Sequence, residues 1–468
     1  MSMASRTLRD GPTRRGMLLT LLAGVPLWLL ASCAVYAPLP LPKAADLAAT
    51  ASPMGPAVAA LATVPPLDMN TVATLAVLDS PQLRSARATM HVAQAQAFAA
   101  GLLPDPQLSY SADYAMDHVI SSTDPRYPEY NAYGLGLALD LQTLLTHAST
   151  HAAATAAYRQ GRLDLLWQEW QTVAQARSLY VQQVIATDRV AFLAPAEQTY
   201  AAAAAHSQRA LAAGNVTLEQ SSADLAVLQD VRAQLGVADR GKLQAEHELR
   251  GLIGVKPDVI IPLQPLAAPP LPPRAQVAAA IEQLAQRRPD LLALRAGYGA
   301  QEERVRTAVL SQFPNISLDL TRARDVSDVH TSGFGITLTL PLFNRGRGEI
   351  AIQRATRAQL RADYQARLDQ AQVNVWQLWD EIEQLDGQLR VLTQQLPNLQ
   401  RSVERARRAY EAGNFPAASY LTLTGAYLSA TSTRFDLFQN LWTDAIGLAT
   451  ELGTQIQPDA TTTQKTSP

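Results

Sequence analysis

One stretch of the sequence, residues 345–414, limits the fold more than any other. Its apolar residues recur at spacings of three and four, which is the heptad pattern of a coiled-coil seam. They are Leu368, Ala371, Val375, Leu378, Ile382, Leu385, Leu389, Leu392 and Leu396. A helix with one narrow apolar stripe must lie against other helices along its length, because the stripe is too narrow to fill a globular core. About 68 residues in one helix would extend on the order of 100 Å.

The same plan occurs twice in the chain. A helical segment from Thr143 to Ala213 ends at Gly214-Asn215, as the later one ends at Gly413-Asn414, and glycine just past a helix is a usual terminator. Upstream, Ser80-Pro81-Gln82-Leu83 matches Arg288-Pro289-Asp290-Leu291. Matching turns, strands and helix lengths at a period of about 200 residues indicate an internal duplication.

The duplication divides the chain into segments. We expect a signal peptide at 1–32, an extended segment at 33–69, a first repeat at 70–254 with its helical hairpin at 143–253, a proline-rich linker at 255–274, a second repeat at 275–453 with its hairpin at 345–452, and a polar, disordered tail at 454–468.

Each repeat also contains two segments that alternate between apolar and small or polar residues, which predicts strands. They span about 106–115 and 132–141 in the first repeat, and about 314–322 and 333–342 in the second. Strands apolar on one side only are typical of a transmembrane β-barrel, and four strands must be pooled with those of other copies because the smallest barrels have about eight. A soluble β-subdomain is the alternative. Candidate aromatic residues at the membrane surfaces are Tyr110, Tyr114, Tyr130, Tyr133, Phe334 and Phe343.

The N-terminal residues have the pattern of an export signal. Arg14-Arg15 precede an apolar run, and Leu30-Ala31-Ser32 comes immediately before Cys33. This order resembles a bacterial lipobox, which would leave a covalent lipid, including palmitate, on Cys33. A plain signal peptide or an N-terminal membrane anchor is the alternative. No other run of about 18 apolar residues follows, so we expect no membrane-spanning helix in the mature chain.

Composition excludes several classes of protein. Cys33 is the only cysteine, which excludes an internal disulfide framework and a cysteine-based zinc cluster. The net charge of −2 implies no general attraction to nucleic acid. His147 and His151 stand four residues apart but lack the glutamate of a zinc protease, so we expect exposed helix residues and no metal. The acidic run Asp380, Glu381, Glu383 and Asp386 is interpreted as a solvated face, and the alternative is a lumen ring that favours cations if the chain is repeated threefold.

Together these features resemble the TolC-type outer-membrane efflux channel family. The resemblance is carried by the lipobox, the duplicated order of helix, strand pair and hairpin, and the Ala-Gly turns. It also rests on short motifs at the strands, namely Leu102-Leu103-Pro104-Asp105-Pro106, Gln312-Phe313-Pro314-Asn315-Ile316 and Leu338-Thr339-Leu340-Pro341-Leu342-Phe343.

The resemblance implies a mainly α fold with a small β part. The long hairpins would form a periplasmic α-barrel, and four strands per chain would contribute to a trimeric, 12-stranded transmembrane β-barrel. It further implies a homotrimeric outer-membrane lipoprotein without an active site. Such a protein would be a passive exit duct for drugs, metal ions or other small molecules. A periplasmic adaptor and an inner-membrane pump, of the resistance-nodulation-division type, would deliver them.

In this family the hairpin tips meet the adaptor and form the aperture. By position the tips are Ala213, Gly214, Asn215 and Val216, and Ala412, Gly413, Asn414 and Phe415. An aspartate common in relatives beyond the second tip is missing from Tyr420–Ala426, and the acidic residues near the first tip, Glu219 and Asp224, are typical of solvated helix positions. Pro195 and Pro397 predict a kink or break before each tip, since an internal proline costs a helix about 3 kcal/mol.

Two other functions fit the same pattern. One is the outer-membrane channel of a type I secretion system. The other is a lipid-anchored coiled-coil scaffold without a pore, which heptads alone do not exclude.

Overall fold

The computed structural model describes residues 36–48, 65–114, 131–412 and 414–454. The chain divides into two compact units, Met1–Asp46 and Leu47–Pro468. Within the described part of the first unit, residues 36–46, the backbone forms neither helix nor strand. Cys33 and the signal segment lie outside the described residues. Everything below concerns the second unit.

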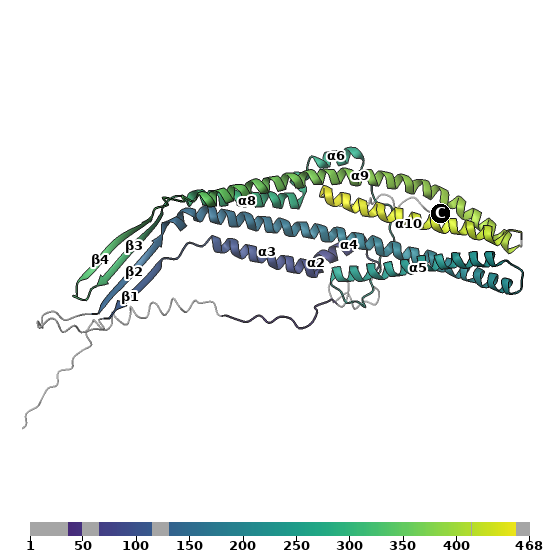
Figure 1. Cartoon of the computed structure of the whole chain (residues 1–468), viewed down its shortest axis with the longest axis horizontal. Coiled ribbons are helices and arrows are strands. Elements are labelled where there is room, and N and C mark those ends of the chain that lie inside the picture. Colours follow the sequence, from purple (N-terminus) through teal and green to yellow (C-terminus); the bar gives the residue numbers. More distant parts are fainter. Residues whose placement is uncertain (1–35, 49–64, 115–130, 413, 455–468) are drawn as a thin grey trace, which may run out of the picture. The chain divides into compact units, whose positions relative to one another are not determined.

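The first repeat in the second unit begins with two helices, α2 (Met69–Asp79) and α3 (Pro81–Ala100). Two strands follow, β1 (Gln107–Asp113) and β2 (Ala132–Asp140), and then the hairpin of α4 (Leu141–Ala212) and α5 (Leu218–Ile253). Helix α4 is 72 residues long and follows β2 without an intervening loop (Figure 1).

The second repeat has the same order after two short helices, α6 (Arg274–Ile281) and α7 (Leu284–Arg287). Helix α8 (Pro289–Leu310) leads into β3 (Asn315–Arg324) and β4 (His330–Thr339), and the hairpin consists of α9 (Arg347–Glu411) and α10 (Ala417–Leu452). The mainly α fold with four strands that the sequence predicts is therefore confirmed.

Short side chains and glycines set the ends of these helices. Asp68 begins α2 by accepting hydrogen bonds from the backbone N–H groups of Asn70 and Thr71, at 2.8 and 2.9 Å. Asp140 begins α4 in the same way, with a 2.8 Å bond from the N–H of Gln142. Past the C-terminus of α4, Gly214 has φ +74°, a left-handed conformation that glycine adopts without steric cost.

The four strands form one antiparallel sheet in the order β1-β2-β3-β4. The repeats meet at its centre, where β2 pairs with β3 and Leu137 lies opposite Leu320. The helices of the two repeats also touch, because α4 contacts both α8 and α10.

The buried residues form several clusters along the helices. The heptad seam lies in one of them, where Ala371, Val375 and Ile382 of α9 pack against Leu441 and Leu448 of α10. Another joins α2, α4 and the end of α5, with Tyr180 donating a 2.7 Å hydrogen bond to the carbonyl of Gln264 in the linker. Long helices with narrow apolar stripes bury their apolar residues in several small clusters along their length, and not in one large core.

Candidate functional site

The sheet has two chemically different faces. In antiparallel strands, residues directly opposite each other point to the same side, so the register sorts the side chains into faces. The apolar face contains the rows Leu108–Leu137–Leu320–Phe334, Leu139–Leu318–Ile336 and Ile316–Leu338. The polar face contains the rows Gln107–Ala138–Asp319–Gly335, Ser109–Gly136–Thr321–Gly333 and Ser111–Gly134–Ala323–Thr331.

The apolar face is uncovered by the described part of the chain. Leu108 is 71% exposed, and Leu320, Phe334 and Ile336 each keep more than half of their accessible area. A continuous exposed apolar face of this kind marks a surface for lipid or for another protein. None of the described helices is long and apolar enough to cross a membrane.

The polar face is lined with small side chains. A Cβ added at Gly136 would lie 2.5 Å from the Ser109 hydroxyl oxygen, so the strand leaves no room for a larger residue there without a shift of Ser109. Asp319 accepts a 3.2 Å hydrogen bond from the hydroxyl of Thr337 on β4. Small and polar side chains on this face are suited to contact with water.

The aromatic residues predicted for the membrane surfaces lie in three places. Tyr110 and Tyr133 belong to the apolar face, near the end of the sheet that is far from the helices. Phe334 is in the middle row of that face, so it is not at a membrane surface if the sheet spans a bilayer. Tyr114 and Phe343 follow β1 and β4 and are exposed, and Tyr130 lies outside the described residues.

Strands β1 and β4 form the two edges of the sheet. Among the described residues, no further strand pairs with either edge. Exposed edges offer unpaired N–H and C=O groups to another chain. The sheet can therefore extend by adding the strands of another copy.

The tips of the two hairpins share one geometry. In the first, the N–H of Asn215 donates a 2.8 Å bond to the carbonyl of Ala210; in the second, the N–H of Asn414 donates a 2.8 Å bond to the carbonyl of Ala409. Ala213, Gly214, Asn215, Ala412 and Asn414 are exposed, whereas Val216 and Phe415 are half-buried; Gly413 lies outside the described residues. The duplication thus extends to the hydrogen bonds of the turns.

An aromatic cluster supports the second tip from behind. The rings of Tyr410 and Tyr420 are stacked with centroids 5.3 Å apart, and Phe415 packs beside them. Behind the first tip, Glu219 is exposed but Asp224 is buried. The interpretation of Asp224 as a solvated residue is therefore wrong, because helix α5 turns it toward neighbouring helices.

Neither helix breaks at its internal proline. Pro195 lies inside α4 and Pro397 inside α9, both of which are continuous. Of the predicted kink or break, the break is therefore absent, because packing along helices of this length outweighs the loss of one backbone hydrogen bond. Leu193, which is fully buried, and Tyr200 show how tightly α4 packs around Pro195. A bend without a break stays a prediction.

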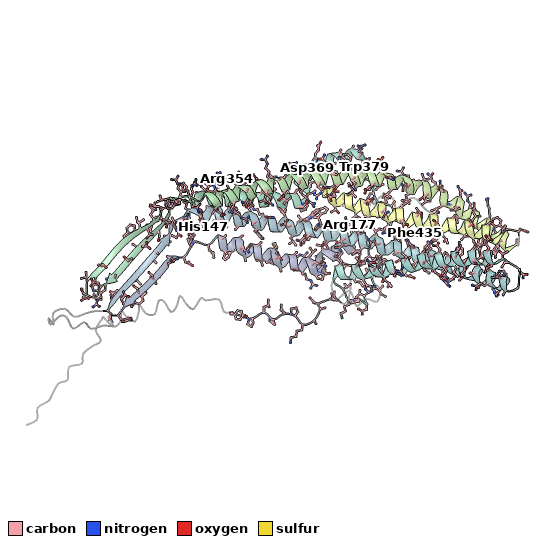
Figure 2. All side chains as sticks on the ribbon, viewed as in Figure 1. His147, Arg177, Arg354, Asp369, Trp379 and Phe435 are labelled. Carbon is pink, nitrogen blue, oxygen red and sulfur yellow. The ribbon has the colours of Figure 1, made fainter. Side chains whose placement is uncertain are left out.

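The histidine pair lies on α4 and the acidic run lies on α9. His147, near the start of α4 (Figure 2), is half-buried with Nε2 3.2 Å from the carbonyl oxygen of Gly101. Its ring stacks on that of His151. The expectation of full exposure holds for His151 alone. Asp380, Glu381 and Glu383 are exposed, and Asp386 pairs with Arg390 on the next turn. Within the described residues, no three His, Cys, Asp or Glu side chains could hold a metal ion.

One buried charge cluster was not predicted from the sequence. The Arg288 side chain is fully buried and donates to Asp290 at 3.0 and 2.8 Å, to the Glu451 carbonyl at 3.2 Å and to the Glu451 carboxylate. Arg367 of α9 also donates to Asp290, at 2.7 Å, and Trp167 of α4 lies under Arg288 at 5.2 Å. The cluster ties α4, α8, α9 and α10 together. The one feature of the sequence that pointed to this cluster is that Arg288, in the second repeat, aligns with the small residue Ser80 in the first repeat.

Each charged group in this cluster stabilises the ionised form of its partners. Burial by itself would raise the pKa of Asp290, but hydrogen bonds and charge from Arg288, with a further contribution from Arg367, hold that pKa below its usual value. Burial would lower the pKa of Arg288, and its carboxylate partners raise it instead. Both groups are therefore held in their charged forms.

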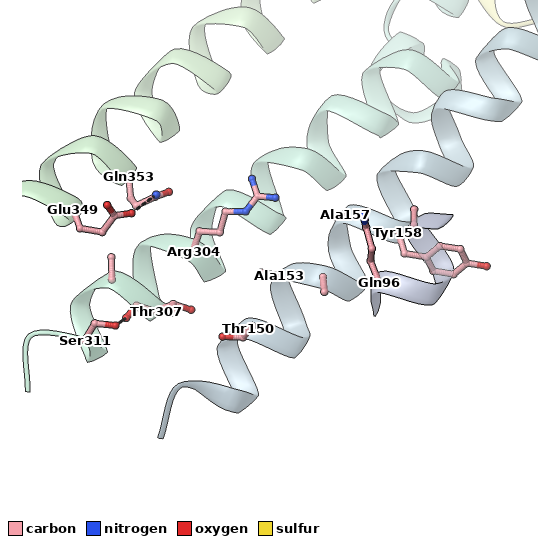
Figure 3. A pocket seen from close by; sticks show the side chains of 13 residues that line it. Gln96, Thr150, Ala153, Ala157, Tyr158, Arg304, Thr307, Ser311, Glu349 and Gln353 are labelled. Atoms are coloured by element: carbon pink, nitrogen blue, oxygen red, sulfur yellow. Dashed lines mark hydrogen bonds between the residues drawn. The ribbon is translucent and has the colours of Figure 1, made fainter. Parts of the chain in front are cut away.

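A pocket of about 510 Å³ lies between α3, α4, α8 and α9 (Figure 3). Its floor is alanine-rich, and its polar groups are largely paired: Gln353 donates to Glu349 at 2.6 Å, and Thr307 donates to Ser149 at 2.8 Å. Such a pocket offers no nucleophile with an adjacent base, so we assign it no catalytic role.

Comparison with known proteins gives three kinds of match. Residues 280–454 match the family model described as outer membrane efflux protein. The "Probable outer membrane lipoprotein SilC" of Salmonella typhimurium is 24% identical over 399 residues, covering 80% of this chain and 81% of SilC. The "Cation efflux system protein CusC" of Escherichia coli is 27% identical over 184 residues, covering 36% of this chain and 40% of CusC.

Solved structures share the fold. A crystal structure of CusC, from a study of its folding and transmembrane channel formation, has a TM-score of 0.68 at 18% identity and covers 90% of this chain and 99% of that one. The outer-membrane channel OprN has a TM-score of 0.69 at 18% identity and covers 91% and 100%.

Proposed function

We propose that this chain, whose residues 280–454 belong to the outer membrane efflux protein family, forms the outer-membrane exit channel of a tripartite efflux system. The observation that carries the proposal is the sheet with one exposed apolar face, one small and polar face and two free edges. Only a closed barrel satisfies the backbone groups of such strands in lipid, and four strands close only with those of other copies.

The channel would be a homotrimer in the outer membrane. Three copies would supply twelve strands, with the apolar face toward lipid and the polar face toward the lumen. The helical hairpins would continue the duct into the periplasm. The relatives' names, an outer membrane lipoprotein and a cation efflux system protein, support this location and role.

The partners follow from the hairpin tips. The Ala213–Val216 turn, which is exposed from Ala213 to Asn215, and its counterpart at Ala412–Phe415 would dock on a periplasmic adaptor. The adaptor would connect to an inner-membrane pump of the resistance-nodulation-division type. Substrates would pass without chemical change, and the name of CusC favours cations among them. We assign no catalytic residue and no cofactor to the chain.

Lipidation of Cys33 belongs to the same proposal. The cysteine would carry the covalent lipid and anchor the first residue of the mature chain in the membrane. The lipobox pattern and the relative described as a lipoprotein support this assignment.

Reconstitution of the purified protein in planar bilayers tests the channel directly. The two β1 variants Ser111→Trp and Leu108→Trp add the same indole to opposite faces of one strand. If the polar face lines the pore, Ser111→Trp lowers the single-channel conductance, because three indoles enter the lumen, whereas Leu108→Trp leaves it unchanged. A monomer without conductance would support the scaffold alternative, and a conductance lowered by Leu108→Trp alone would reverse the assignment of the faces.

A further inference from the structure

Charged residues in the four strands are separated by sign between the faces of the sheet. The acidic residues Asp113, Asp140 and Asp319 all belong to the polar face. The arginines Arg322 and Arg324 both belong to the apolar face, because they continue the alternation of the aliphatic residues in β3. A face that meets hydrocarbon is an unfavourable place for a charge, so this arrangement requires an explanation.

Both arginines lie at the end of the sheet farthest from the helices. Arg322 shares a row with Tyr110, Leu135 and Ser332, and Arg324 shares the outermost row with Tyr133. The rows nearer the helices are aliphatic. Arginine on the lipid side of a barrel is costly at the bilayer centre and nearly free of cost at its surface, and tyrosine is enriched at that same level. These rows therefore belong at the headgroup level of the membrane.

The two arginines differ in their partners. Arg324 lies 2.7 Å from Asp328 in the turn that joins β3 and β4, so its charge is offset within the hairpin. The turn is ordered by Asp325, whose carboxylate accepts bonds from the N–H groups of Ser327 and Val329 at 2.8 and 2.9 Å. Arg322 is exposed and forms no hydrogen bond or ion pair with another described residue. Within the described part of the chain, its guanidinium donors remain available to an external acceptor.

We propose that Arg322 forms a binding site for phosphate-bearing, anionic lipid headgroups in the membrane leaflet around the hairpin end of the barrel. A guanidinium presents two parallel N–H donors that match two phosphate oxygens. Tyr110 belongs to the same row, two strands away across Leu135, and carries a hydroxyl that can act as a further donor. The apolar row Leu108–Leu137–Leu320–Phe334 on the helix side would receive the acyl chain. The site rests on the proposed function, since it requires the apolar face to meet lipid.

The test compares the lipids that copurified trimers retain when anionic cardiolipin and zwitterionic phosphatidylcholine compete for them, counted by native mass spectrometry. The wild type is expected to prefer cardiolipin. Arg322→Gln is expected to lose about fivefold of that preference per site, which is the contribution of one arginine near a membrane surface. Arg354→Gln removes an exposed arginine near the start of α9, beyond the helix end of the sheet and therefore at the opposite end from Arg322 (Figure 2). It is the matched control and keeps the preference.

Two further arms and the conductance of the wild type decide the outcome. Arg322→Lys keeps the charge but lacks the two parallel N–H donors, so it restores only part of the preference, and this partial recovery separates binding from misfolding. Inorganic phosphate at equal concentration does not displace cardiolipin; displacement would show a plain anion site and overturn the proposal. An unchanged preference in Arg322→Gln would also overturn it. A wild type that conducts but shows no preference rejects the headgroup site alone, whereas one that neither inserts nor conducts rejects the channel as well.

Discussion

Replacing Arg288 with methionine tests how much of the helical architecture depends on one buried charge. The variant keeps the bulk of the side chain and removes every donor. Asp290, itself buried, is left with Arg367 at 2.7 Å as its partner, and the Glu451 carboxylate loses its bond from Arg288. Trp167 also loses the cation above its ring.

The expected cost follows from this burial. Removing one member of a buried ion pair costs about 3–5 kcal/mol, because its buried partners lose a charge that offset their desolvation. No discount for solvent screening applies, since the Arg288 side chain is 0% exposed and that of Asp290 is 10% exposed. With an m-value of about 3 kcal/mol/M, a loss of about 4 kcal/mol lowers the urea midpoint by roughly 1.3 M.

The assay is equilibrium unfolding in urea, followed by helical circular dichroism in detergent. Arg354→Met removes a charge from an exposed position on α9 and should shift the midpoint little. The double variant Arg288→Met with Asp290→Asn should recover part of the loss, because it removes the buried carboxylate that has lost its bonds from Arg288. A midpoint for Arg288→Met equal to that of the Arg354 control would refute the reasoning.

Two further predictions concern the same repeat. The pKa of Asp290 is lower in the folded protein than in the unfolded chain. Its contribution to the free energy of unfolding is therefore present above pH about 4 and is lost as the pH falls through the lower, folded-state pKa. The urea midpoint of the wild type should fall more steeply below pH about 4 than that of Asp290→Asn. At the heptad seam, Val375→Ala should cost about 2 kcal/mol because Val375 is 0% exposed, whereas Val373→Ala on the same helix, where valine is 59% exposed, should cost less than about 0.5 kcal/mol. Equal midpoints for the two valine variants in urea unfolding would contradict the assignment of the seam.

The sequence by itself determined the features that follow from a regular spacing of residues within one helix or one strand. The spacing of Ala371, Val375 and Ile382 identified the buried stripe of α9, and strict alternation placed Leu108 and Leu320 on the apolar side of their strands. The spacing between side chains on one face follows from the geometry of a single helix or strand, so the sequence of that segment alone is enough to identify the buried face. Gly214 at the first hairpin tip was predictable for the same reason, because a left-handed residue past the end of a helix is a local requirement.

Only the tertiary structure decided what depends on distant partners. Arg288 and Glu451 are far apart in the sequence, and nothing local to either indicates their contact. Pro195 predicted a break from local rules, yet packing with neighbouring helices keeps α4 continuous. Asp224 looked solvated until its neighbours buried it. The role of Arg322 required the register of β2, β3 and β4, because only the pairing shows which rows lie at the hairpin end and which charges share a face. The spacing of apolar residues is a property of one segment, whereas burial and charge pairing depend on the contacts between segments.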